Sequence, residues 1–235
     1  MARREVALEL VRSLEFPARI LPAMDGRALD GAARLRFVRR LMHAPAYPFP
    51  LLDAEVGCFL SHRRAWEAII DEGCDAGLVA EDDVSPASPR FAEVVAAAAA
   101  VIGPHEVIRF PLRERPDRGP IARISGGTRF CEPRLPGLGM QMQLVGREAA
   151  RMLLAASEAF DRPVDSLVQM QWLHGARVFA ALPVVIREVD FMVGGTAIHV
   201  KRGGFAHRMS HELRRPMFRF AVRIANERWR RRSSA

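Results

Sequence analysis

The chain has 235 residues, of which 49% are apolar and 26% are charged, as in ordinary soluble globular domains. This length allows one large domain with a substantial core. No window reaches the roughly 18 uncharged apolar residues of a membrane-spanning helix, and the N-terminal sequence MARREVALELV has acids inside its apolar stretch and no small-residue cleavage site. We therefore expect neither a membrane span nor a signal peptide.

The cysteines and the distribution of charge give two further indications. Cys58, Cys74 and Cys131 are scattered without metal-site spacing, which favours buried thiols in a reduced, cytosolic compartment. Eleven of the 35 Lys/Arg and two of the 27 Asp/Glu lie in residues 201–235, whereas residues 1–200 are close to neutral. A polyanionic partner would therefore be met by the C-terminal tail.

The first part of the chain shows helical and strand-like patterns in turn. Residues 4–14 predict a helix, ARILPAMDG at 18–26 predicts a strand ending in a turn, and the prolines of residues 27–53 predict irregular structure. The following segments predict a helix over 55–73 and a short apolar strand over 76–84 that runs into acidic residues.

The later segments continue this alternation. In order, they predict helix 91–102, strand 105–111, a long excursion over 111–137 with a hairpin near Gly126-Gly127, strand 140–146, helices 147–160 and 163–175, and strand 179–188. Helices alternating with strands, without a repeat, predict an α/β layered domain. Ligands of such sheets gather at the carboxyl ends of the strands.

Three consecutive acids stand at one of these strand ends. Glu81, Asp82 and Asp83 follow the apolar run AGLVA directly, and neighbouring carboxylates repel one another. A divalent cation such as Mg²⁺ or Mn²⁺ would remove that repulsion, because hard cations take oxygen ligands and bridge to phosphates. The alternative is a solvated acidic turn, which is common in proteins.

The segment that contains these acids resembles a known family. Gly57, Cys58, Ser61, His62, Trp66 and the Glu81-Asp82-Asp83 triplet resemble, in order and spacing, the recurring pattern of glycosyltransferase family 25. Bacterial lipooligosaccharide sugar transferases and collagen galactosyltransferases belong to this family. LPAMDGRAL at 21–29, GMQMQLVGREAARMLL at 139–154 and RPVDSLV at 162–168 are similar to further family segments, so the resemblance spans residues 3–200.

The resemblance implies a Rossmann-like, GT-A-type nucleotide-sugar-binding domain over residues 1–200. It implies transfer of a hexose, galactose being the commonest guess, from a UDP-sugar to a lipopolysaccharide, lipooligosaccharide or related glycan, with inversion and with Mn²⁺ or Mg²⁺. We expect Asp82 and Asp83 to hold the metal and diphosphate, and Glu81 to face the ribose or support the site. Ser61 and His62 would help order the donor, although a histidine hydrogen-bonded in the core is the simpler interpretation of His62, and core packing that of Trp66.

The general base that inversion requires is open among several acids. Asp165, at a step where family members carry an aspartate, is the first candidate, although capping a helix N-terminus would also explain it. Glu188 and Asp190, after the last strand, are the alternatives. His199 is a candidate late metal ligand.

Two departures from the family pattern stand out. An apolar strand usually precedes the arginines that Arg3 and Arg4 resemble, so we expect the first strand of the domain to be missing. Gln143 stands where relatives often carry a tyrosine, so stacking of a sugar on an aromatic ring is not expected there. An alternative is therefore that this chain is a relative of the family without activity, and that it acts as a binding or scaffold subunit.

The tail, residues 201–235, predicts an amphipathic helix after Pro216. One face carries Met217, Phe218, Ala221, Val222, Ala225 and Trp229, and arginines at 215, 219 and 223 line another. This pattern favours a helix lying on anionic lipid, which would place the protein at the cytoplasmic face of the inner membrane. A helix docked on the body and a nucleic-acid-binding arm are the alternatives.

Overall fold

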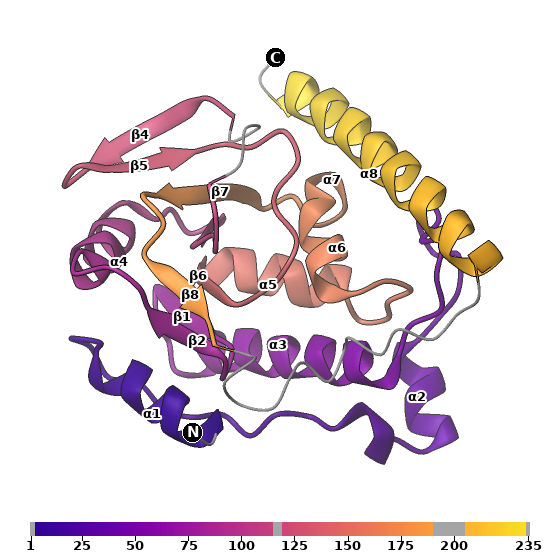
Figure 1. Ribbon diagram of the computed structural model, residues 1–235, viewed down its shortest axis with the longest axis horizontal. Helices are drawn as coiled ribbons and strands as arrows, with labels where there is room; N and C mark the ends of the chain where they lie inside the picture. The colour runs from indigo at the N-terminus through magenta and orange to yellow at the C-terminus, as the bar shows by residue number, and fades with distance from the viewer. Residues whose placement is uncertain (1–2, 115–118, 190–204, 234–235) are drawn as a thin grey trace.

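The computed structural model describes residues 3–114, 119–189 and 205–233, and it shows an α/β domain with a long C-terminal helix (Figure 1). The helical elements are α1 (Arg3–Arg12), η1 (Gly26–Ala28), α2 (Gly31–Phe37), α3 (Asp53–Asp71), α4 (Phe91–Val101), α5 (Arg147–Ala156), α6 (Val164–Gln169), α7 (Gln171–His174) and α8 (Phe205–Ser233). The predicted α/β class is confirmed. Among the described residues, no helix combines the length and the apolar character needed to cross a membrane.

A mixed sheet of six strands forms the centre of the domain. Its order is β1 (Ala76–Ala80), β6 (Met142–Gly146), β3 (Glu106–Arg109), β7 (Arg177–Leu182), β5 (Thr128–Cys131) and β4 (Ile121–Ser125). β6 is antiparallel to both β1 and β3, and β3 is parallel to β7. The carboxyl ends of β1, β3 and β7 therefore point the same way, toward one edge of the molecule.

A second, two-stranded sheet lies at that edge. β2 (Val84–Pro86) pairs antiparallel with β8 (Ile186–Glu188), and Val84 stands opposite Glu188. The chain thus leaves the large sheet after β1 and after β7 and joins the small sheet from both places (Figure 1). This crossing brings two acidic segments together that are about a hundred residues apart in the sequence.

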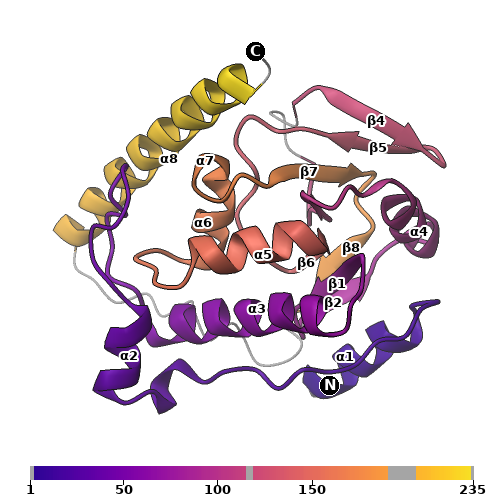
Figure 2. The ribbon, with the colours of Figure 1, turned by 180° about the vertical axis from the view of Figure 1, so that it is seen from behind.

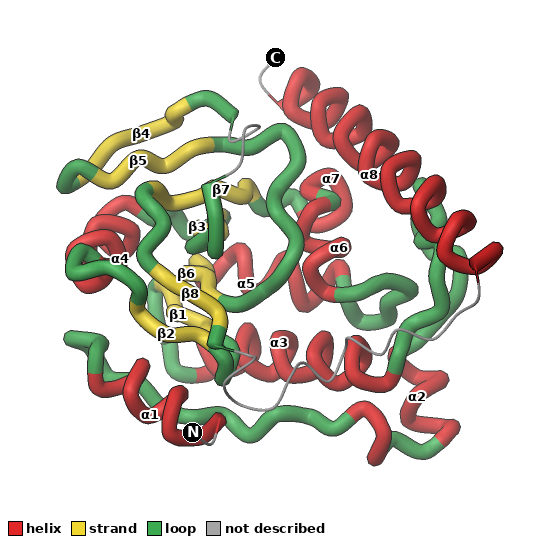
Figure 3. The backbone as a smooth tube through the Cα atoms, viewed as in Figure 1, coloured by secondary structure: helices red, strands yellow, loops and turns green. Residues whose placement is uncertain are grey.

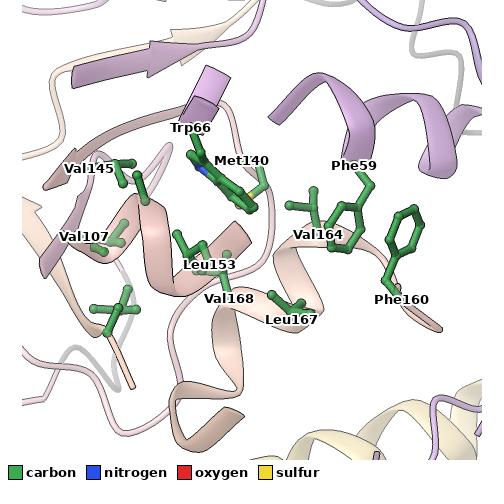
Figure 4. Packing of buried hydrophobic residues seen from close by; sticks show 14 of the residues in the cluster. Phe59, Trp66, Val107, Met140, Val145, Leu153, Phe160, Val164, Leu167 and Val168 are labelled. Carbon is green, nitrogen blue, oxygen red and sulfur yellow. The ribbon is translucent and has the colours of Figure 1, made fainter. Parts of the chain in front are cut away.

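The two faces of the large sheet bury separate sets of side chains. Successive residues of the central strands point to opposite faces, as the pleat requires. Val107, Val145 and Val178 face α3, α5 and α6, whereas Ile108, Leu144 and Phe179 face α4. Figure 2 shows α3 and α5 side by side, and Figure 4 shows Trp66, Met140 and Leu153 among the side chains packed there. Trp66 is completely buried, so its predicted role in the core is confirmed.

Four local predictions need correction. Residues 18–26 form no strand; Asp25 instead caps the short helix η1. The stretch 27–53 is not wholly irregular, because α2 lies inside it, capped by Asp30 (Figure 3). The helix expected over 163–175 is two helices that meet at Met170. The strand expected over 179–188 is β7 and β8, separated where Pro183 supplies no N–H to a ladder.

The C-terminal helix packs partly against the body. α8 begins at Phe205, eleven residues before Pro216, and its Phe218 and Val222 are buried with Met170. Tyr47 meets the Phe218 ring edge-on, with the ring centroids 5.5 Å apart. Part of the apolar face that favoured a lipid surface is therefore covered by protein. Met217 and Phe220 stay exposed.

Candidate functional site

The acidic turn joins β1 to β2 and is held by backbone hydrogen bonds on both sides. The Glu81 N–H donates to the Gln141 carbonyl at 2.8 Å, and the Val189 N–H donates to the Asp83 carbonyl at 2.8 Å. The three acidic side chains therefore start from a fixed backbone at the carboxyl end of β1. They nevertheless have very different surroundings.

Asp83 is the buried member of the triplet. The residue is only 4% exposed, and its Oδ1 has no hydrogen-bond partner among the residues that the structure describes. Burial, together with repulsion from Glu81, Glu188 and Asp82, raises the pKa of Asp83 to about 7. The positive charge of Arg3 favours ionised Asp83 but has the smallest effect of the causes named, so a divalent cation would supply the larger compensation.

Asp82 lies at the surface and pairs with a helix far away in the sequence. Its Oδ1 accepts a hydrogen bond from Arg3 Nη1 at 2.7 Å, and the Asp82 side chain is 51% exposed. An exposed pair of this kind is worth at most about 1 kcal/mol. Asp82 can therefore exchange this partner for a ligand at little expense in stability.

Glu81 points the other way, toward α3. Its Oε1 lies 3.2 Å from His62 Nε2 and 3.7 Å from Cys58 Sγ. Burial opposes ionisation of Glu81, yet the hydrogen bonds from His62 and Cys58 outweigh it and hold the pKa of this carboxyl below its usual range. On the other side of the ring, Gln143 Nε2 is 3.4 Å from His62 Nδ1. His62 is thus a buried histidine with partners at both nitrogens; its ordering of a donor stays a prediction.

Gly57 and Ser61 hold a loop against α3. A Cβ added at Gly57 would stand 2.5 Å from the Met24 carbonyl oxygen and 2.7 Å from the Gly26 nitrogen. One turn later, Ser61 Oγ accepts a hydrogen bond from the Met24 N–H at 2.8 Å and donates to the Gly57 carbonyl at 2.8 Å. The structure thus gives both residues a packing role, and donor binding by Ser61 stays a prediction.

A cavity of about 380 Å³ opens beside the acids. Its lining comes from the carboxyl end of β3, the loop 133–141, β7 and β8, and it includes Arg109, Arg113, Gln141 and Glu188 among apolar side chains. Glu188 connects the cavity to the turn, because its β8 partner Val84 directly follows Asp83. The carboxyl ends of strands are where α/β sheets place their ligands.

Asp165 holds one of the loops that line this cavity. Its Oδ2 accepts a hydrogen bond from the Gly139 N–H at 3.0 Å, in the loop whose Leu138 and Gln141 line the cavity. Pro163, not Asp165, occupies the N-cap position of α6, so helix capping is the wrong explanation for this aspartate. Asp190 and His199 lie outside the described residues.

Three residues around Glu81, namely Cys58, Gln143 and Arg109, are given no role of their own by the sequence patterns. Cys58 enters the sequence argument only as part of the family pattern, although it stands four residues before His62 and hence on the same helix face. Gln143 enters it only through its divergence from a tyrosine. Arg109 lies in the cavity wall and its charge favours ionised Glu81; no local pattern marks it.

The fold and this edge of it define a class. An α/β sheet whose carboxyl ends carry an acidic turn with a buried Asp83, and a cavity beside it, is consistent with a Rossmann-like ligand-binding domain. Residues 1–110 match the family described as glycosyltransferase family 25 (LPS biosynthesis protein), which supports assignment of this part of the chain to that family. The resemblance noted in the sequence is confirmed over residues 1–110, and its extension to residue 200 stays a prediction.

Curated relatives match a shorter part of the chain. This chain is 35% identical over 85 residues to procollagen galactosyltransferase 1 of Danio rerio, and 38% identical over 87 residues to procollagen galactosyltransferase 2 of Homo sapiens. It is also 38% identical over 87 residues to the inactive glycosyltransferase 25 family member 3 of Homo sapiens. Each match covers 35% of this chain and 14% of the relative. Relatives named as galactosyltransferases and a relative named as inactive thus resemble this chain to a similar degree.

Proposed function

We propose that this chain transfers a hexose from a nucleotide sugar, a UDP-hexose such as UDP-galactose, to a hydroxyl of a glycan. The observation that carries the proposal is the buried Asp83, whose Oδ1 has no partner among the described residues and whose turn is joined to the cavity through Glu188. The match of residues 1–110 to the family supports the reaction class, and the galactosyltransferase relatives support the hexose. The acidic turn supplies the chemistry that a diphosphate leaving group needs.

Asp83 and Asp82 are the residues that would hold a divalent cation. The unpartnered Oδ1 of Asp83 and the exposed carboxylate of Asp82 fit the oxygen ligands that Mg²⁺ and Mn²⁺ take. When bound, the cation neutralises charge on the departing nucleoside diphosphate. Arg109 and Arg113, both in the cavity wall, add positive charge on the side of the bound donor.

Glu188 is the residue we assign as the general base. It lines the cavity and lies next to the acidic turn, whereas Asp165 already accepts a hydrogen bond from the Gly139 N–H. Glu188 takes the proton of the acceptor hydroxyl as its oxygen bonds to the anomeric carbon. The bond from that carbon to the diphosphate breaks on the opposite face, and its electron pair leaves with the nucleotide, which inverts the centre.

The first experiment is calorimetric titration of UDP into the chain, with and without Mn²⁺. We expect Mn²⁺-dependent binding that disappears in Asp83→Asn, which removes the charge at constant size. Asp75→Asn, at the amino end of β1, is the matched control and should bind as wild type. Mn²⁺-dependent binding that persists in Asp83→Asn would overturn the assignment of the metal site.

The base is tested by single-turnover transfer of hexose from the donor. Glu188→Gln should lower the rate by about 100-fold or more while leaving UDP binding intact. Glu93→Gln, an exposed acid on α4, is the control. A larger loss in Asp165→Asn than in Glu188→Gln would reverse the assignment.

The acceptor we propose is lipopolysaccharide, lipooligosaccharide or a related glycan at the cytoplasmic face of the inner membrane. The exposed Met217 and Phe220 of α8, beside its arginines, support contact with an anionic lipid surface. Because Phe218 and Val222 pack on the body, the test is the double variant Met217→Ser, Phe220→Ser rather than a truncation. Retention of full binding to anionic vesicles in that variant would contradict the proposal.

A second candidate function is sugar-nucleotide binding without transfer. The observation that favours it is the equal match to an inactive family member. UDP binding without any turnover of UDP-hexoses, in a chain whose Glu188→Gln variant behaves as wild type, would select this alternative.

A further inference from the structure

Three side chains of different chemistry converge at the inner side of the acidic turn. Cys58 Sγ, His62 and Glu81 each offer one ligand atom, and these atoms lie within 4.8 Å of one another. Cys58 and His62 stand one helical turn apart on α3, and Glu81 reaches them from the end of β1. Both supporting elements are regular and packed in the core, so the three groups are held in place.

Two of the three spacings, those from Glu81 to His62 and to Cys58, are close to the edges of a tetrahedral metal site. Bonds of about 2.0 Å to nitrogen or oxygen and about 2.3 Å to sulfur place neighbouring ligand atoms roughly 3.3–3.6 Å apart. The oxygen–nitrogen distance from Glu81 to His62 is 3.2 Å, and the oxygen–sulfur distance from Glu81 to Cys58 is 3.7 Å. Small movements of the side chains would therefore place all three atoms around one ion.

Gln143 supplies a second, independent observation. It is completely buried, and its Oε1 has no hydrogen-bond partner among the described residues while its amide nitrogen faces His62 Nδ1. Half a turn of the amide about its last bond brings the oxygen to Nδ1, where it accepts a hydrogen bond from the ring N–H. That hydrogen bond fixes the tautomer whose Nε2 is free to bind a metal, as the acceptors that hold the other nitrogen of metal-ligating histidines do.

We propose that Cys58, His62 and Glu81 form a binding site for a borderline transition-metal ion of the Zn²⁺ type. Thiolate and imidazole ligands select such ions over Mg²⁺ and Mn²⁺, which prefer the all-oxygen pair Asp82 and Asp83. One thiolate and one carboxylate balance the charge of a divalent ion. Three protein ligands leave a fourth position for water or a substrate oxygen, and Glu81, 27% exposed at its side chain, opens that position to solvent.

Cobalt is the probe that tests this site directly. Co²⁺ bound to a thiolate has an intense near-ultraviolet charge-transfer absorption that oxygen and nitrogen ligands do not produce. We expect titration of the reduced 235-residue chain with Co²⁺ to give this band at one equivalent, and Zn²⁺ to displace it. Absence of the band in the wild type would overturn the proposal, and the three residues would then form only a hydrogen-bonded support for Glu81.

Variants separate this site from the other groups nearby. Cys58→Ser should abolish the band, and Glu81→Gln should weaken cobalt binding, whereas Cys74→Ser, another half-buried cysteine, should keep the wild-type titration. Gln143→Leu should weaken binding about 10- to 100-fold, as a positioning residue does. A band kept in Cys58→Ser, or lost in Cys74→Ser, would contradict the assignment.

Asp82→Asn distinguishes this proposal from the donor site. It should leave the cobalt band unchanged, because Asp82 contributes nothing to the Cys58, His62 and Glu81 group. Thermal unfolding of each variant checks that its fold is retained. The cobalt titration needs no nucleotide or sugar, so it stands whether or not UDP binding is found.

Discussion

Two buried aspartates, Asp161 and Asp83, differ in what surrounds them. Arg162 donates to Asp161 twice, at 2.6 and 3.1 Å, and the Met42 N–H donates to it at 2.8 Å. Arg162 in turn donates to the carbonyls of His43 and Pro45. Asp83 is as deeply buried, yet its Oδ1 has no partner among the described residues, and three other acids repel it.

Asp161 is a charge whose partners stabilise the fold, whereas Asp83 is a buried acid that a bound cation would stabilise. The pKa of Asp161 is lowered, because the hydrogen bonds and charge of Arg162 outweigh the effect of burial. The pKa of Asp83 is raised because burial and repulsion act together. A fully paired group gains nothing from a new partner, whereas an unpaired one does. Disrupting the Asp161–Arg162 pair should therefore lower the stability of the fold, whereas removing the charge of Asp83 should raise it.

The largest expected effect is on the paired group. Arg162→Met leaves Asp161 buried without its cation, so the free energy of unfolding should fall by about 3–5 kcal/mol in chemical denaturation. Arg151→Met, which removes the exposed partner of Glu148, is the control and should change it by less than about 1 kcal/mol. Equal losses of stability in both variants would show that the buried pair of Asp161 and Arg162 contributes no more than an exposed pair.

Asp83→Asn should stabilise the chain when no cation is present. The folded chain keeps a proton on Asp83 up to about pH 7, while an unfolded aspartate releases it near its ordinary pKa of 3.8. Wild-type stability therefore falls as pH rises through this window, and the asparagine variant escapes that loss. At pH 8 it should be more stable by on the order of 2 kcal/mol, and at pH 4 the two should agree. Reversal of this trend would show that Asp83 is already compensated.

Asn226 provides a neutral version of the paired case. Its side chain accepts from the Gln171 N–H at 3.1 Å and donates to the Gln169 carbonyl at 2.8 Å. Asn226→Ala leaves these buried backbone groups unpaired and should lower the free energy of unfolding by about 1–2 kcal/mol. Arg228→Ala, on the same helix but at its surface, is the control. A neutral result for Asn226→Ala would mean that water replaces the amide.

The smallest effect concerns His174, a buried group that stays neutral. The Ala176 N–H donates to its Nδ1 and its Nε2 faces the Val168 carbonyl; burial lowers the pKa of His174 to about 4. The unfolded chain takes up a proton near pH 6.5, so stability present above that pH is lost as pH falls toward 4. Between about pH 7 and 5.5 the wild type should lose about 1 kcal/mol relative to His174→Gln. His105→Gln, exposed, should show no such difference.

Local patterns predicted much of the sheet and part of the site. The apolar run before Glu81 predicts β1, and Gly126-Gly127, both at positive φ, predict the β4–β5 turn. The pairing of Val84 with Glu188 was not predictable, because it depends on two strands that only the folded chain brings together. The strand expected at 18–26 failed because that segment is held by contacts with Gly57 and Ser61 instead of a ladder.

The side chain of Asn226 has a consequence for how this protein can be dissected. By bonding to Gln169 and Gln171, it spans the break at Met170 and ties α6 to α7 from outside. α6 carries Asp165, which in turn holds the Gly139 loop at the cavity. Through these contacts α8 stabilises the wall of the cavity. A variant truncated near residue 200 would lose these contacts, and the loop that lines the cavity would be held less firmly.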